Sequence, residues 1–197
     1  DENKLGHLIP ETAHHIEIVD LDGEHSLIAE YPTNAEDSQF IVEGNFIAVE
    51  DIDHQWQLFE IAKINTIANA AGEVKRLYGE HIYYELGTYP VITQNFTSVT
   101  PELALGIILA VTRWELGDIE VSGERSFFVE EVNPLEALIR ASVAYGGELR
   151  FRSEISESNT IDLYVDLLMR RGALTGKRFE FGEDVHEINM DVDMRPV

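Results

Sequence analysis

The residues that most resemble a chemical site lie near the end of the chain, in Gly172-Ala-Leu-Thr-Gly176-Lys177. A P-loop, G-x-x-x-x-G-K-[ST], needs its longer spacing so that backbone N–H groups can surround a phosphate, and its hydroxyl residue holds magnesium. Here only three residues separate the two glycines, and Arg178 stands where the hydroxyl residue should be. We therefore interpret the motif as a turn and expect no nucleotide site.

The seven histidines of the chain do not predict a metal site. His14 and His15 are adjacent, and neighbouring side chains of a strand point to opposite faces, so the two cannot share a metal ion. His15-Ile-Glu17 matches the H-x-E part of the zinc deaminase signature, but that signature also needs a P-C-x-x-C segment and the chain has no cysteine. Four further histidines stand alone in the sequence: His25, His54, His81 and His186.

Carboxylates and hydroxyls are present without the spacing that catalysis needs. Asp20-Leu-Asp22-Gly23 begins like a calcium loop, but the third acidic ligand and the distal glutamate are missing, so we predict a hairpin turn. Asp191 and Asp193 would share a strand face, yet in a chain with 37 acids such pairs arise by chance. No nucleophile-elbow motif surrounds Ser126, Ser142 or Ser153. We predict no catalytic, cofactor-binding or metal-binding residue and no enzyme activity.

Alternation of apolar and polar residues predicts an antiparallel β-meander up to Leu86. Asp22-Gly23 supplies the positive φ angles of a tight turn between the first two strands. Trp56 and Trp114 are predicted to be core residues rather than platforms for a ligand. The predicted strands are His15–Asp20, His25–Tyr31, Phe40–Val49 with a turn or bulge at Gly44, Trp56–Ile64 and Val74–Leu86.

Helical spacing replaces this alternation after Thr100. Thr100 and Pro101 are typical of a helix start, and we expect that helix to end at Gly117. A second helix is expected from Asn133 to Tyr145, with Gly146-Gly147 ending it. Extended segments are expected at Ile119–Phe128, Glu148–Ile155, Thr160–Leu168, Lys177–Phe181 and Val185–Val192.

These segments predict three parts of the chain. Residues 1–15 are expected to form a mobile N-terminal lead. Residues 16–91 together with 172–197 are expected to form a small antiparallel β-barrel-like domain, and 92–171 an α+β domain inserted into it. Phe179 and Phe181 would pack where the chain returns to the first domain. The predicted fold class is α+β and β-rich.

Composition excludes several function classes. The chain has 197 residues and 44% hydrophobic residues, which is enough for a real core. The absence of cysteine excludes disulfides, thiolate zinc sites and cysteine nucleophiles. The longest apolar run, Leu103–Val111, is too short to span a membrane, and no signal peptide is visible, so we expect no membrane anchor.

The net charge of −23 repels nucleic acid and anionic lipid. The acids are spread along the chain, so they do not indicate a disordered tail. Two interpretations stay open: the charge keeps the protein soluble, or it forms a face or channel that must not bind DNA or that meets a basic partner.

Several stretches in a common order resemble the N-terminal hub region of the phage tail-associated proteins, also described as the phage minor structural protein or prophage endopeptidase tail family. The resemblance covers residues 15–193, and its strongest part is Gly-Lys-Arg-Phe-Glu-Phe-Gly-Glu-Asp. The stretches are Val42–Val49, Trp56–Ile61, Thr112–Gly117, Asn133–Leu138, Gly146–Phe151 and Gly176–Val185.

The resemblance implies a fold similar to the hub protein of contractile phage tails, with a β-barrel-type domain interrupted by an α+β domain. It implies a homotrimer at the tail tip of the virion, below the distal tail protein and able to contact the tape-measure protein. DNA would pass through without specific binding. Peptidoglycan cleavage or host binding belongs to C-terminal regions of the family, so we expect the chain to be a fragment or a shortened relative without that activity.

Two other functions stay open at this stage. One is a cell-wall-degrading endopeptidase or glycosidase, which would need clustered His, Asp or Glu residues. The other is a host-surface or carbohydrate-binding module, which an exposed groove lined by Tyr83, Tyr84, Tyr89 or Trp56 would favour.

Overall fold

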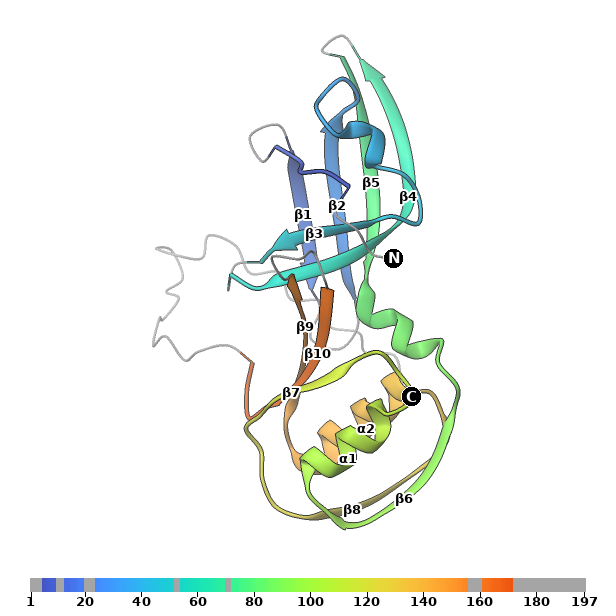
Figure 1. Cartoon of the computed structure of the whole chain (residues 1–197), viewed down its shortest axis with the longest axis vertical. Coiled ribbons are helices and arrows are strands. Elements are labelled where there is room, and N and C mark those ends of the chain that lie inside the picture. The colour runs from blue at the N-terminus through green and yellow to red at the C-terminus, as the bar shows by residue number, and fades with distance from the viewer. Residues whose placement is uncertain are drawn as a thin grey trace, which may run out of the picture.

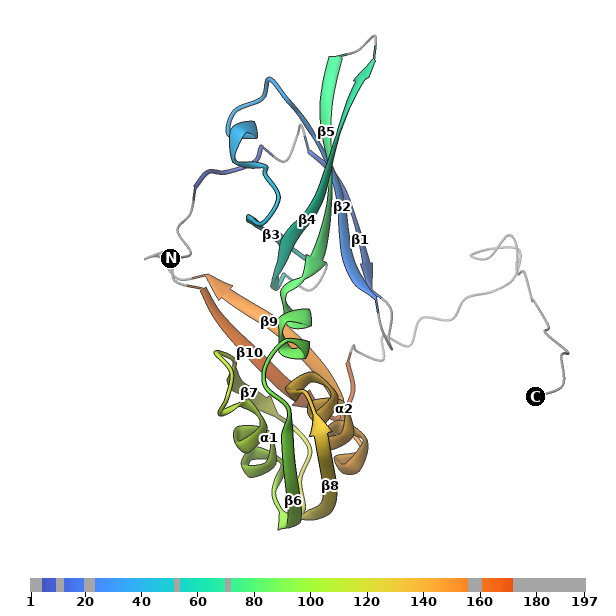
Figure 2. The same ribbon diagram turned by 90° about the vertical axis from the view of Figure 1, so that its right-hand side faces the viewer.

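The computed structural model describes residues 5–9, 13–19, 24–51, 54–69, 72–155 and 161–171. Within these residues the chain is mostly β-structure with two α-helices, which confirms the predicted β-rich α+β fold class. Figures 1 and 2 show the N-terminal strands at one end of the long axis and both helices at the other.

The N-terminal end is an antiparallel sheet in the order β1-β2-β5-β4, with β3 paired to β4. Alternation along β2 turns Leu27, Ala29 and Tyr31 inward, as its sequence predicts. The strands are β1 (His14–Val19), β2 (His25–Pro32), β3 (Phe46–Glu50), β4 (Trp56–Asn69) and β5 (Gly72–His81).

β4 curls this sheet. Its first residues pair with β3 and its later ones with β5, and its register shifts between Ile61 and Lys63. A bulge of this kind bends a strand and increases its twist. The sheet forms a curled half-barrel (Figure 1) over one apolar core, which contains Leu27, Ala29, Tyr31, Ile41, Phe59, Ile61 and Leu77.

Two predicted strands of this part are shorter than expected. The predicted strand Phe40–Val49 is wrong before Phe46, because Ser38–Phe40 form a short 3-10 helix, η1, and the chain turns before β3 begins. The strand predicted at Val74–Leu86 ends too late, because β5 stops at His81 and Ile82–Gly87 form a second 3-10 helix, η2. His81 accepts a hydrogen bond from the N–H of Tyr83 and so caps η2.

The other end contains a second sheet region, a two-stranded ribbon and both α-helices. β9 and β10 are antiparallel, β7 lies parallel to β10, and β6 pairs with β8 in the ribbon. β9 meets β4 through the pair Trp56 and Ser153, which joins the two ends in one sheet. The elements are β6 (Ile92–Val99), α1 (Pro101–Leu109), β7 (Glu115–Ile119), β8 (Arg125–Val132), α2 (Pro134–Tyr145), β9 (Glu148–Ile155) and β10 (Ile161–Leu168).

The first predicted helix is too long. α1 ends at Leu109, and the predicted end at Gly117 is wrong because Glu115–Ile119 pair with β10 as a strand. The hydroxyl of Thr112 donates to the carbonyl of Leu109 and accepts the N–H of Trp114, which stabilises the turn between them. The predicted extended segment 119–128 is divided in the structure between the end of β7 and the start of β8.

The second predicted helix is confirmed. The side chain of Asn133 accepts the N–H of Glu136 at 2.9 Å, and Pro134 occupies the first turn. Gly146 ends the helix at φ 71°, a left-handed conformation that glycine adopts without a Cβ penalty.

α1, α2 and the surrounding strands enclose a second apolar core. Its largest fully buried side chains include Phe96, Leu105, Ile108, Leu138 and Leu167. The strands predicted at 177–181 and 185–192 lie outside the described residues, so the domain boundaries at 16, 92 and 172 stay predictions. In the described part, no helix has the length and apolar content needed to cross a membrane.

Candidate functional site

His81 is the most enclosed titratable side chain at the junction of the two ends. It closes β5 with 1% of its surface exposed. Its Nδ1 accepts the N–H of Tyr83 at 3.1 Å, so the proton lies on Nε2, which donates to Gln57 Oε1 at 2.9 Å. The amide of Gln57 donates in turn to Asp51 Oδ2 at 2.7 Å. Both ring nitrogens are therefore occupied, and His81 has no free nitrogen with which to act as a base.

Aromatic rings enclose His81 on its other sides. The ring of His25 stacks on it with centroids 4.1 Å apart, and Phe59 meets it edge to face at 5.3 Å. Burial lowers the pKa of His81 well below its ordinary value, and the charges that His25 and Arg171 can carry lower it further. His81 therefore stays neutral and serves as a packed, hydrogen-bonded core residue.

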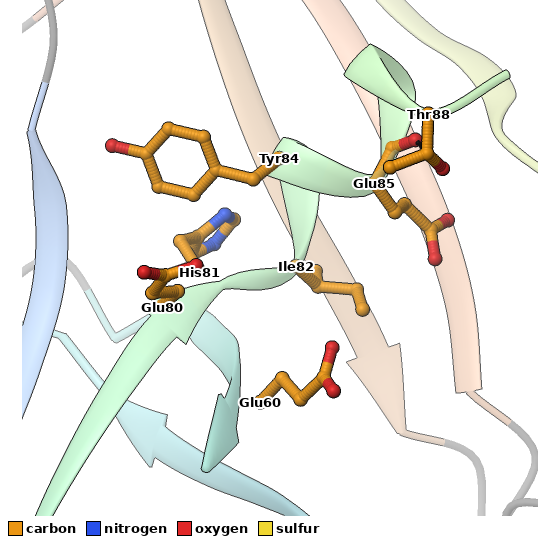
Figure 3. A pocket seen from close by; sticks show the side chains of 7 residues that line it. All are labelled: Glu60, Glu80, His81, Ile82, Tyr84, Glu85 and Thr88. Atoms are coloured by element: carbon orange, nitrogen blue, oxygen red, sulfur yellow. Dashed lines mark hydrogen bonds between the residues drawn. The ribbon is translucent and has the colours of Figure 1, made fainter. Parts of the chain in front are cut away.

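A pocket of about 350 Å³ opens beside His81 (Figure 3). Glu60 on β4 and Glu80 on β5 are direct cross-strand partners, so their carboxylates stand on the same face. Neither forms an ion pair with a described residue, and like charges in such a pair repel. The lining residues are Glu60, Glu80, His81, Ile82, Tyr84, Glu85 and Thr88.

Glu85 is fixed at the far side of this pocket. Its carboxylate receives two hydrogen bonds from Arg113, both at 2.8 Å, and one from the indole N–H of Trp114 at 2.7 Å. This contact ties η2 to the segment that follows α1. Because its acceptors are used, Glu85 has a structural role and does not present a reactive group.

A second polar cluster surrounds Asp166 of β10, which is fully buried. Arg150 donates to Asp166 Oδ2 at 2.7 Å and Arg152 donates to the same oxygen at 3.1 Å. The N–H of Asp118 donates to Oδ1 at 2.7 Å. A Cβ on Gly117 would lie 1.9 Å from Oδ1, so only glycine lets β7 approach the carboxylate. The cluster therefore joins β7, β9 and β10 through charge-assisted hydrogen bonds.

The residues singled out from sequence are not brought together. Ser153 donates to the carbonyl of Trp56, Ser142 donates to the carbonyl of Ile139, and Ser126 accepts the N–H of Ser98. Each serine therefore satisfies a backbone group in a different part of the fold.

The structure describes only some of the histidines, and it does not describe the C-terminal motif. His54 is exposed and forms a contact of 2.7 Å with Glu50. The side chains of His14, His15 and Glu17, and all of residues 172–197, lie outside the described part, so the readings of the Gly172–Lys177 motif, His186, Asp191 and Asp193 stay predictions. No group of His, Asp and Glu in the described part has the arrangement of a metal site.

The aromatic residues divide between core and surface. Trp114 is buried, as predicted, but the prediction for Trp56 is wrong, because 41% of its surface is exposed. Tyr83 stacks on Phe151 with centroids 4.7 Å apart, and the hydroxyl of Tyr89 accepts the N–H of Arg113. Tyr83 and Tyr89 are therefore engaged in packing and hydrogen bonds, whereas Tyr84 lines the pocket beside His81.

Sequence reasoning missed both polar clusters. Asp166 occupies an alternating strand in a position that looks solvent-facing. The available signal was Arg150 and Arg152 at period two on the neighbouring strand. Gln57 carried no signal, because its role depends on the long-range contact with His81.

No protein-family model matches the chain, and no curated protein sequence matches it. Among solved structures, the chain is similar to the tail protein from Neisseria meningitidis MC58, with a TM-score of 0.51 and 14% identity, covering 78% of this chain and 45% of that one. Prophage tail protein gp18 from Listeria monocytogenes EGD-e gives a TM-score of 0.46 and 16% identity, covering 78% of this chain and 43% of that one.

The 43 kDa tail protein of prophage MuSo2 from Shewanella oneidensis gives a TM-score of 0.43 and 9% identity, covering 78% of this chain and 47% of that one. This chain thus spans less than half the length of each of these proteins. At the identity found, the first similarity shows the fold alone: the chain shares the fold of the Neisseria tail protein.

Proposed function

We propose that the chain is a structural component of a phage or prophage tail, placed at the tail tip or baseplate hub, and that it works without catalysis. The observation that carries this proposal is the fold shared with a tail protein. The chain would be made in the bacterial cytoplasm and would act in the virion tail.

The polar interior supports a structural role. His81, Glu85 and Asp166 each satisfy their hydrogen-bonding groups within the described fold. Groups held in this way position strands and connections, whereas a catalytic acid or base must present a proton site to a substrate. The clusters around His81 and Asp166 therefore serve to hold neighbouring elements rigidly in position.

The assembly that we propose is a homotrimeric ring below the distal tail protein, able to contact the tape-measure protein. DNA would pass along its axis without specific binding. The net charge of −23 supports this arrangement, because an acidic wall repels the phosphate backbone.

Deletion of the gene in the phage or prophage that encodes the chain tests the proposal. Electron microscopy after induction should show particles with absent or malformed tail tips, and expression of the wild-type chain in trans should restore them. Intact tails on particles that bind cells but fail to infect would instead indicate a cell-wall hydrolase. Intact tails on particles that fail to bind cells would indicate an adhesion module.

A further inference from the structure

The N-terminal sheet has two edges that no described strand covers. Its strands run in the order β1-β2-β5-β4, and β1 pairs with β2 alone. At the other edge, β3 and β9 pair with β4 no further along than Glu60, so residues 64–69 have β5 on one side and no described strand on the other. The ends of β4 and β5 lie beyond β1 and β2 (Figure 1). An uncovered edge presents backbone groups that can pair with another strand.

A hydrogen bond at the start of this stretch shows where the backbone groups of β4 point. The N–H of Ile64 donates to the Glu43 carboxylate at 3.3 Å, on the side away from β5. In an antiparallel ladder the direction alternates from one residue to the next. The N–H and C=O groups of Thr66 and Ala68 therefore also point away from β5 and are available to a further strand.

The same alternation gives the outward groups of β1. The N–H of Thr33 donates to the carbonyl of Glu73, so the odd-numbered residues of β5 direct their backbone groups to β2. Ala29 pairs with β5 in this way and lies opposite His15 in the ladder of β1 and β2. His15 and, two residues on, Glu17 therefore direct their N–H and C=O groups away from β2.

Residues 64–69 of β4, Ile-Asn-Thr-Ile-Ala-Asn, lack the features with which proteins usually protect a strand edge. They include no charged residue and no proline, and the bulge of β4 lies before them, between Ile61 and Lys63. Asn65, Thr66 and Ala68 are exposed. An incoming strand therefore meets no charge, proline or bulge along this part of β4.

The two edges belong to parts of the sequence with opposite charge. Residues 5–62, which include β1, β2 and β3, contain thirteen acidic residues and no lysine or arginine. Residues 63–76 of the β4–β5 hairpin contain three bases, Lys63, Lys75 and Arg76, and a single acid. Arg76 is paired with Glu30, whereas Lys63 is exposed and has no ion pair within the described part. This charge difference favours contact between unlike edges over contact of β4 with β4 or of β1 with β1.

We propose that residues 64–69 of β4 pair with β1 of a second copy of the chain, so that the N-terminal sheet continues from one copy into the next. Strand direction alternates along β1-β2-β5-β4, so β1 of the next copy meets β4 antiparallel when the axis relating the copies runs along the strands. A contact between two different edges is head-to-tail, and it closes into a ring when the rotation closes. The inference rests on the homotrimer proposed above and names the surfaces that build it.

A proline at an outward-pointing N–H tests the β4 edge. Thr66→Pro removes an N–H that β5 does not use, and proline is tolerated at such positions of an edge strand, so the variant should fold. Thr66→Ala keeps the N–H and is the matched control. Light scattering of the full-length chain should give a trimer for wild type and Thr66→Ala, and an apparent dissociation constant at least tenfold higher for Thr66→Pro. Assembly of Thr66→Pro equal to that of wild type, or a wild-type monomer at every concentration, would overturn the proposal.

Mixing two blocked variants tests the head-to-tail arrangement. Glu17→Pro blocks β1 and leaves β4 free, whereas Thr66→Pro leaves β1 free. At a concentration where wild type is trimeric, each variant alone should be monomeric, and the mixture should form a one-to-one dimer and nothing larger. Ala68→Pro blocks the β4 edge at a different residue and should behave like Thr66→Pro. Assembly of either blocked variant by itself, or a mixture of folded variants that stays monomeric, would contradict the pairing of β4 with β1.

Complementation separates this inference from the proposed function. In the phage or prophage that lacks the gene, wild type and Thr66→Ala should restore the tail tips, and Thr66→Pro should not. Restored tail tips with Thr66→Pro would overturn the edge pairing and leave the role as a tail component intact. Intact tail tips without any copy of the gene would overturn the proposed function, and the masses of the variants would still decide the edge pairing.

Discussion

Because Gly117 has no side chain, the backbone of β7 can approach the carboxylate of Asp166 closely enough to hydrogen-bond with it. The carboxylate of Asp166 is fully buried and depends on Arg150, Arg152 and the N–H of Asp118 for compensation of its charge. A buried carboxylate that loses its charged and hydrogen-bonding partners strongly destabilises the folded state. Stability of the β7–β10–β9 region therefore depends on the close approach at Gly117.

Gly117→Ala should destabilise the chain by about 3 kcal/mol, because the new Cβ would displace the carboxylate from its donors. Chemical denaturation measures the change. Gly87→Ala is the control: a Cβ there meets nothing within 4 Å, and its unfolding free energy should stay near that of wild type. Equal stability of both variants would show that Asp166 can move at little cost.

Because His81 is buried and neutral, we expect the free energy of unfolding to depend on pH in one direction. Its pKa in the folded state lies well below the ordinary 6.5, chiefly through burial, so the unfolded chain binds the proton more readily. The contribution of His81 to stability is therefore complete above pH 6.5 and is lost as the pH falls below it. The slope for one proton is about 1.4 kcal/mol per pH unit.

His81→Asn should remove this slope, because the asparagine can still accept the N–H of Tyr83 but does not titrate near neutrality. Unfolding free energies of both proteins across the range below pH 6.5 give the comparison. Carboxylates titrate in both proteins and cancel in the difference. Parallel curves for wild type and variant would contradict the buried neutral histidine.

Among the helices and strands, those that the sequence predicts correctly have a local periodicity, cap or turn that agrees with their tertiary contacts. β2, β9, β10 and α2 combine clear periodicity with caps or turns, and the structure has them where expected. β6 was not predicted, because its polar residues hide the alternation. η2 and β7 were mispredicted, because the cap from His81 and the parallel pairing with β10 come from residues distant in sequence.

The two helices differ in how they begin, and this difference can be measured. Asn133→Ala should cost about 1 kcal/mol, because it removes the side-chain bond to the N–H of Glu136. Thr100 begins α1 without a side-chain cap bond, so Thr100→Ala should change stability much less. Thermal or denaturant unfolding of the pair tests the assignment, and a larger effect at Thr100 would contradict it.

At the scale of the whole molecule, two apolar cores are joined by the contact of β4 with β9 and by η2. The polar clusters at His81 and Glu85 lie at that joint, and the cluster at Asp166 joins β7, β9 and β10 within the end that contains the helices. The sequence could not predict this geometry, because each cluster combines residues from elements that are distant in the sequence. The excess of acidic residues, in contrast, follows directly from the composition, and the structure adds that the acidic chain has the fold of a tail protein.

The measurement that tests the tail-component proposal most directly is the solution mass of the chain by light scattering, alone and mixed with the distal tail protein of the same phage. We expect a trimer, or a complex of defined stoichiometry with the distal tail protein. A strict monomer that does not bind the distal tail protein at any concentration tested would contradict it.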